Sequence, residues 1–253
     1  MSAFEILGLA LAAALAGMIN AIAGGGTLLT FPVLLFYGTL PVVANATSTV
    51  ALVIGTAGSI FGFRRQMEAV RPWLARFVPV SLLGGLLGSM LLTRTSNESF
   101  ARLVPFLILF ATLLFFAQGA FRRFAQTDGA QPVRHVGVAI AFQFAVAIYG
   151  GYFGAGIGIL MLASLGFIGF TDIHEMNALK NVLGSLINVV AAIWFVASGL
   201  VEWPKVGVMT VGALAGYFIG AHYSQRIPRE WVRRAITAIG LVISVYTFWK
   251  QFA

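Results

Sequence analysis

The chain has 253 residues, of which 59% are hydrophobic and only 9% are charged, whereas soluble proteins average about 25% charged residues. Together with a mean hydropathy of +0.93, this composition excludes a soluble globular domain, a disordered chain and a collagen-like fibre, and it indicates a membrane protein. The absence of cysteine excludes disulfides, thiolate metal sites and a cysteine nucleophile. The formal net charge of +8 does not indicate nucleic-acid binding, because the basic residues stand between apolar runs, where they set membrane topology.

The apolar runs, taken in chain order, cover residues 5–37, 43–63, 73–92, 100–119, 136–170, 175–198, 204–223 and 231–249. Because a spanning helix needs about 20 apolar residues, the first and fifth runs are too long to be one helix each. Both contain a glycine cluster: Gly24, Gly25 and Gly26 in one, and Gly154, Gly156 and Gly158 in the other. We therefore predict an all-α integral membrane protein of about eight spans, with new helices beginning after the glycines, near Thr27 and Ile159.

The chain repeats itself at an offset of 132 residues, and no gap is needed to align the halves. The aligned pairs include Gly24 with Gly156, Gly26 with Gly158, Asn45 with Asn177, Pro72 with Pro204, Arg94 with Arg226 and Glu98 with Glu230. We expect a first transmembrane repeat at 1–120, a polar linker at 121–135 and a second repeat at 136–253. Each half would hold a glycine-broken helix or helical hairpin plus three transmembrane helices.

The positions of Lys and Arg distinguish parallel repeats from inverted ones. If each long run crosses the membrane once, these residues divide nine to seven between the two sides, which is almost no bias. If each long run instead enters and returns as a hairpin, twelve lie on one side, and the other side holds only Arg94, Arg102, Lys205 and Lys250. Since positive residues favour the cytoplasm, the second division favours inverted repeats.

Polar side chains gather beside both glycine breaks. Backbone that is open at membrane depth must be buried by protein or line a watery cavity, and paired broken helices typically mark a transporter's central site. The first amides of the helices after the breaks are expected to lack internal partners, and with the helix dipole they favour an anion. The residues expected to bind this substrate are Asn20, Gly24, Gly25, Gly26, Thr27, Asn45, Thr47, Ser48, Gly154, Gly156, Gly158, Asn177, Lys180, Asn181 and Asn188.

Lys180 is the strongest of these candidates, because burying a lysine in a membrane helix costs free energy and such a lysine is usually functional. On a helix that begins near Ile173, the residues Asn177, Lys180, Asn181 and Asn188 share one face. Lys180 lies only about two turns into that helix. An interfacial anchor that reaches the lipid headgroups is therefore the alternative to a substrate role.

Two glycine stripes are typical of close helix packing: Gly84 with Gly88, and Gly212 with Gly216 and Gly220. A homodimer contact through these faces is the alternative role. No protease, hydrolase or nucleotide-binding motif occurs, and all eight acidic residues lie at or near the ends of runs. We therefore expect no enzymatic activity, no metal and no cofactor, and as partners a small anionic substrate and the lipid bilayer.

Residues 17–35 (GMINAIAGGGTLLTFPVLL) resemble the TauE/SafE family, which is described as sulfite exporters. Residues 149–158 (YGGYFGAGIG), 177–181 (NALKN) and 199–203 (GLVEW) extend the resemblance to the second half. The resemblance implies a multi-pass carrier in the bacterial cytoplasmic membrane that exports sulfite, sulfonates or related small organic anions. We expect a secondary transporter that works by alternating access, with a passive anion channel or a non-transporting membrane assembly factor as alternatives.

Overall fold

A computed structural model describes residues 1–22, 25–62, 64–127, 136–167, 170, 172–223 and 229–252. These residues form ten α-helices and no strand, so the predicted all-helical fold is confirmed. The helices are α1 (Ala3–Ile22), α2 (Thr27–Phe36), α3 (Pro41–Gly62), α4 (Arg64–Arg94), α5 (Asn97–Thr127), α6 (Val136–Tyr152), α7 (Ile157–Phe167), α8 (Ile173–Ala197), α9 (Trp203–Tyr223) and α10 (Arg229–Phe252).

Glycine ends the first helix of each half, as the sequence predicts. Gly25 has φ +98°, and Gly154 and Gly156 have φ +79° and +76°. This left-handed region is strained for residues with a side chain, so glycine lets the chain turn sharply there. The next helices begin at Thr27, as predicted, and at Ile157, two residues before the predicted position. Each long apolar run is therefore divided into two helices.

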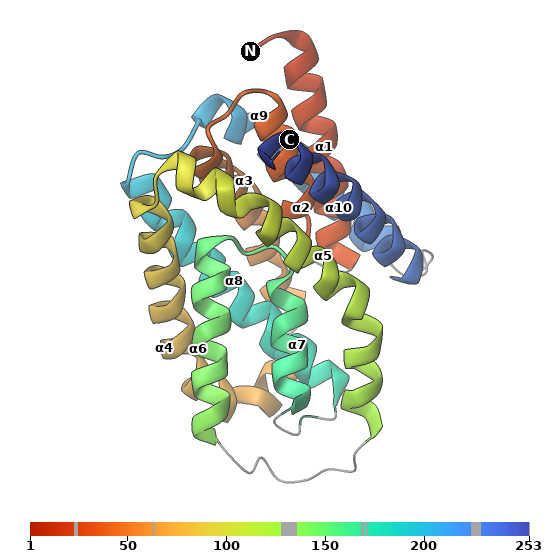
Figure 1. Cartoon of the computed structure of the whole chain (residues 1–253). Coiled ribbons are helices and arrows are strands. Elements are labelled where there is room, and N and C mark those ends of the chain that lie inside the picture. Colours follow the sequence, from red (N-terminus) through yellow and green to blue (C-terminus); the bar gives the residue numbers. More distant parts are fainter. Residues whose placement is uncertain are drawn as a thin grey trace.

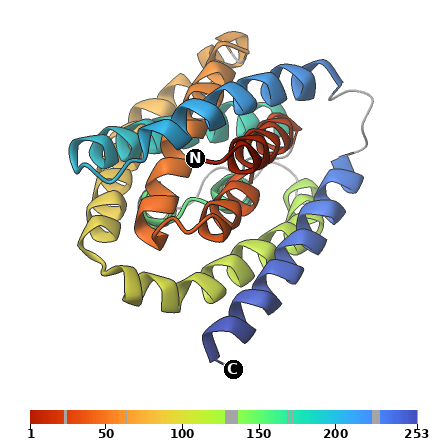
Figure 2. The same ribbon diagram turned by 90° about the horizontal axis from the view of Figure 1, so that it is seen from above.

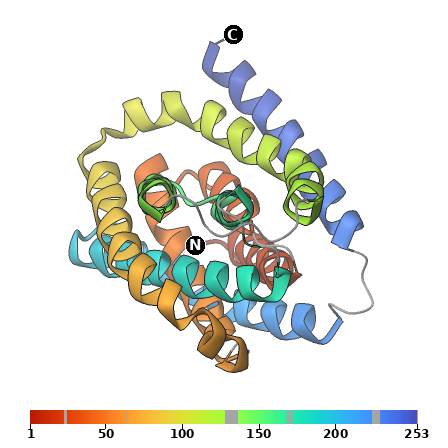
Figure 3. The ribbon, with the colours of Figure 1, turned by 90° about the horizontal axis from the view of Figure 1, so that it is seen from below.

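The two broken runs form helical hairpins that enter the molecule from opposite ends. In Figure 1, α1 and α2 reach inward from the end that carries the N terminus, whereas α6 and α7 reach inward from the end near residues 127 and 136. The view from below shows α6 and α7 end-on, surrounded by α4, α5 and α8 (Figure 3). Seen from above, α10 lies at the periphery and crosses α5 (Figure 2).

The first helix of each half packs against a helix of the other half. Helix α1 of the first half packs along α9 of the second, and α6 of the second half packs along α4 of the first. The glycine stripes permit this close approach. A methyl group on Gly216 would collide with the carbonyl of Ala14, and one on Gly88 would collide with the carbonyl of Ile148. These faces are thus occupied by packing within one copy and are not free to contact a second copy as a dimer interface.

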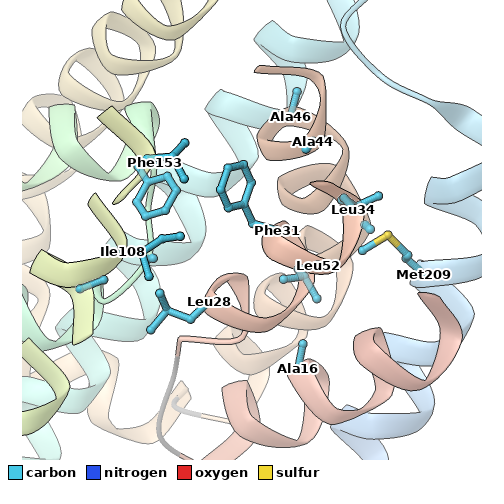
Figure 4. Close-up of a cluster of buried hydrophobic side chains, with 14 of the residues drawn as sticks. Ala16, Leu28, Phe31, Leu34, Ala44, Ala46, Leu52, Ile108, Phe153 and Met209 are labelled. Carbon is cyan, nitrogen blue, oxygen red and sulfur yellow. The ribbon is translucent and has the colours of Figure 1, made fainter. Parts of the chain in front are cut away.

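The aromatic core of the molecule lies where the hairpins meet. The rings of Phe31 in α2 and Phe153, at the end of α6, contact each other edge-to-face with centroids 5.5 Å apart, as Figure 4 shows. Phe100 of α5 packs against both rings, at 6.2 and 6.4 Å. All three side chains are buried, so α2, α5 and the C-terminal end of α6 are held together in one packed layer.

The protein is a multi-pass membrane protein. Five segments within the described residues are long and apolar enough to cross a bilayer: Ala3–Ala21, Val70–Arg94, Asn97–Ala117, Glu175–Ala197 and Trp231–Gln251. Large apolar side chains are exposed in stripes on the outer helices, for example Leu83, Leu87 and Leu91 on α4, as expected of a lipid-facing surface. The hairpin helices α2, α6 and α7 are apolar but shorter. The count of about eight spans and the inverted membrane topology stay predictions.

The boundary expected after residue 120 lies inside a helix. Helix α5 continues to Thr127, so the first part of the predicted linker prolongs the last helix of the first half. Residues 121–126 contain arginine, glutamine and alanine, which are good helix formers, and neither glycine nor proline. The remainder of the predicted linker, 128–135, lies outside the described residues.

Candidate functional site

The two glycine breaks lie against one stretch of α5. A methyl group on Gly25 would collide with the ring of Phe115, whereas one on Gly156 would lie 3.4 Å from Leu114 Cδ1 and 3.7 Å from Ala111. These three α5 residues are buried and span little more than one turn. The fold therefore brings together the breaks that the sequence places 132 residues apart. Gly24, a predicted site residue, lies outside the described residues.

Most amides at the first break already have acceptors. The Gly26 amide donates to Asn20 Oδ1 at 2.6 Å, and the Leu28 and Leu29 amides donate to the carbonyls of Gly25 and Gly26 at 3.0 and 2.9 Å. At the second break, the Ile159 amide donates to the Gly156 carbonyl at 2.9 Å. The expectation of unpaired amides is wrong for these groups, because the Asn20 side chain and the carbonyls of the break glycines accept their hydrogen bonds.

The polar residues of α3 are engaged in hydrogen bonds that hold helices together. Ser48 Oγ lies 2.6 Å from Thr30 Oγ1 of α2, and both residues are completely buried. Thr47 Oγ1 accepts a bond of 3.1 Å from the amide of Glu202 in the second half. Ser48 and Thr47 were predicted to bind substrate, but in this arrangement their hydroxyls connect α3 to its neighbours.

Asn45 connects the first half to the second break. Its Nδ2 donates to the carbonyl of Tyr152, at the C-terminal end of α6, at 3.1 Å. This carbonyl is one of the last in α6 and cannot be paired within the helix. The Asn45 side chain is buried, and its Oδ1 has no hydrogen-bond partner within the described part of the chain. Asn45 therefore caps α6. Thr27, another predicted site residue, is half-buried beside the first break.

The second-half candidates share one face of α8, as predicted. Asn177, Lys180, Asn181 and Asn188 are all half-buried, whereas Ala178, Leu179 and Leu183 on the other face are buried in the core. Gly184 lies between Lys180 and Asn188 at the same i, i+4 spacing. A methyl group on Gly184 would meet no atom of the described residues within 4 Å, so with respect to them this face has open space along its middle.

This α8 face lies against the second break. A methyl group on Gly158, in the first turn of α7, would lie 3.2 Å from Lys180 Cδ, and one on Gly154 would lie 4.0 Å from Asn188 Oδ1. The structure thus brings Lys180 and Asn188 to opposite ends of the segment 154–158. The basic side chain lies beside the positive end of the α7 dipole, which is a favourable place for an anion and a poor one for a cation.

One polar cluster was not predicted as a site. In the sequence analysis Lys205 serves only to predict which side of the membrane a segment faces, yet the residue is only 8% exposed. Its Nζ lies 2.7 Å from Thr39 Oγ1, 2.9 Å from Glu202 and 3.4 Å from Glu5. The i, i+3 spacing of Glu202 and Lys205 is a signal for their pairing. Nothing in the sequence indicates that Glu5 and Thr39 would meet them. Among the described residues no cluster of His, Asp and Glu could hold a metal ion.

Comparison with known proteins agrees with the helical membrane architecture. The family described as Sulfite exporter TauE/SafE matches residues 9–247. The chain is 27% identical to a "Probable membrane transporter protein" of Haemophilus influenzae, over 93% of this chain and 91% of that protein. It is 26% identical to "Probable membrane transporter protein YfcA" of Escherichia coli K12, over 92% and 85% of the respective chains. A further relative, "Probable membrane transporter protein ORF9" of a Sinorhizobium species, is 25% identical over 96% and 92%.

No solved structure matches the chain. The match to the family covers nearly all of both halves, including both glycine breaks and the whole of the α8 polar face. The helical hairpins, the exposed apolar stripes and this match lead to one conclusion: the chain belongs to the TauE/SafE family of membrane proteins.

Proposed function

We propose that this protein is a secondary transporter that exports a small anion, such as sulfite or an organosulfonate, across the bacterial cytoplasmic membrane. The observation that carries this proposal is the half-buried polar face of α8 against the start of α7, with Lys180 as its charge. Lysine and amide groups are donors that suit an oxyanion stripped of water. A charge inside a membrane protein is retained where it binds an ion or a partner.

The binding site in this proposal is asymmetric. Its donors come from Asn177, Lys180, Asn181 and Asn188 of the second half, whereas Ser48, Thr47 and Asn45 of the first half hold helices together. The first half contributes the α5 wall that covers both breaks.

The proposed mechanism is alternating access between two inverted halves. The hairpins enter from opposite ends (Figure 1), and the reciprocal packing of α1 on α9 and of α4 on α6 gives each half a matching contact with the other. A small rocking of one half against the other would then open the α8 face to one side at a time. The chain has no nucleotide-binding motif, so an ion or substrate gradient would drive the movement.

A thermal-shift screen tests the substrate class. Purified protein is titrated with sulfite, methanesulfonate, acetate and chloride, and a ligand at 100 times its Kd should stabilise the folded protein by about 2.7 kcal/mol. We expect stabilisation by a sulfur oxyanion in the wild type and in Lys250→Gln, which changes an exposed lysine of α10. We expect none in Lys180→Gln. Equal stabilisation of both variants would exclude Lys180 from the site.

A further inference from the structure

A buried charged cluster lies near the starts of α1 and α9, apart from the proposed anion site. Helix α1 begins at the end of the molecule that carries the N terminus (Figure 1). The Lys205 ammonium group donates to Thr39 Oγ1 at 2.7 Å and pairs with Glu202 at 2.9 Å and with Glu5 at 3.4 Å. The Lys205 and Glu5 side chains are 10% and 16% exposed, whereas the Glu202 side chain is 38% exposed. One hydrogen bond and two ion pairs therefore hold the largely buried ammonium group.

The cluster joins the two halves of the chain. Glu5 belongs to α1 and Thr39 to the segment between α2 and α3, both in the first half, whereas Glu202 and Lys205 lie at the start of α9 in the second. The amide of Glu202 also donates to Thr47 of α3 at 3.1 Å. Separation of the halves at this end would break the contacts of Lys205 with Glu5 and Thr39.

Lys205 would keep a charged partner after such a separation. Glu202 stands three residues before it, at the start of the same helix, so this pair moves with α9. A buried ion pair is strongly destabilising to break when it leaves one charge alone. Here the charge would pass from three partners to one on its own half, so loss of the contact with Glu5 would not leave Lys205 alone.

The opposite end of the molecule has no equivalent cluster among the described residues. The positions related to Glu5, Glu202 and Lys205 by the 132-residue offset hold Gly137, Val70 and Trp73. Trp73 stacks on Phe77 at 5.6 Å and contacts Phe170 edge-on at 5.1 Å. The two ends are therefore held by different chemistry: ionic at the N-terminal end and apolar at the other.

We propose that the contact between Lys205 and Glu5 is a latch that closes the N-terminal end of the transporter and parts when the halves separate there. The latch rests on the proposed function, since it assigns one step of alternating access to named residues. Loss of the latch shifts the population toward the state that is open at this end, while the α8 face keeps its donors.

Cysteine labelling tests the latch without a substrate, because the chain has no cysteine. A reporter is introduced as Gly184→Cys, where the α8 face has open space, and a membrane-impermeant maleimide is added from each side of oriented vesicles. A Ser198→Cys variant, exposed just before α9, identifies the N-terminal side. We expect Lys205→Met to raise the labelling rate from that side at least about tenfold, which corresponds to a shift of about 1.4 kcal/mol.

Glu5→Gln, which keeps the shape of the side chain, should have the same effect if Lys205→Met does not fold. The matched control is Glu98→Gln, which removes an exposed ion pair with Arg102 and should leave the rate unchanged. An unchanged rate in both latch variants would overturn the proposal and make the cluster a structural contact. A raised rate in a protein that moves no anion would uphold the latch and contradict the proposed function.

Discussion

Polar residues at matching positions of the two repeats differ in their burial and in their contacts. Ser48 and Lys180 are 132 residues apart in the chain, yet Ser48 is buried against Thr30 while Lys180 lies half-buried beside Gly158. A hydroxyl group can be satisfied by one neighbour inside a membrane protein, whereas an ammonium group needs a negative partner. The repeat therefore conserves the backbone break and differs in the chemistry beside it.

The hydroxyl pair of Thr30 and Ser48 should contribute to stability and not to transport. Thr30→Val leaves the Ser48 hydroxyl without that buried partner, which costs roughly 1–3 kcal/mol. The double variant Thr30→Val with Ser48→Ala removes both hydroxyls and should recover part of that loss. Chemical denaturation in detergent measures the loss of unfolding free energy in each variant. A loss in the double variant that exceeds the sum of the losses in the two single variants would contradict this interpretation.

At the scale of helices, glycine decides how closely elements approach. Gly216 of α9 has no room for a methyl group because the Ala14 carbonyl of α1 occupies the space. A methyl group on Gly207 of the same helix would meet no atom within 4 Å in the described part of the chain. Gly216→Ala should therefore destabilise the protein by roughly 1–3 kcal/mol, and Gly207→Ala should be neutral or stabilise it by up to about 1 kcal/mol. Thermal unfolding of both variants in detergent tests this contrast, and equal melting temperatures would refute it.

Helix positions could be predicted from the sequence because they depend on local pattern. The start of α2 at Thr27 and of α8 at Ile173 are as predicted, and α7 begins two residues early because Gly156, not Gly158, is the last residue with positive φ. The long runs were divided correctly because their length exceeds the bilayer thickness and glycine clusters interrupt them.

Partners between distant helices could not be predicted in this way. Asn45 bonds to Tyr152 and Lys205 to Glu5, and each contact depends on how the halves interlock, which no local pattern records. The same holds for the Gly26 amide, whose acceptor Asn20 lies in the preceding helix. Sequence reasoning thus found the polar residues near the breaks but not which of them would bond to neighbouring helices.

At the scale of the whole molecule, the hairpins enter from opposite ends and the halves exchange helices. Inverted membrane topology predicts that positions related by the 132-residue offset face opposite sides of the membrane. Gln66→Cys and Ser198→Cys are such a pair, near the start of α4 and just before α9. Impermeant maleimide added to intact cells should label only one of them. Labelling of both from the same side would support parallel repeats.

Anion flux through reconstituted protein tests the central claim most directly. Proteoliposomes loaded with sulfite, with and without an imposed pH gradient, would carry the wild type, Lys180→Gln or the exposed control Lys250→Gln. We predict efflux in the wild type and control, uphill movement with the gradient, and at least about a hundredfold lower flux in Lys180→Gln, equivalent to about 2.7 kcal/mol. Flux that only follows the sulfite gradient would indicate a channel, and equal flux in all three proteins would contradict the anion site on α8.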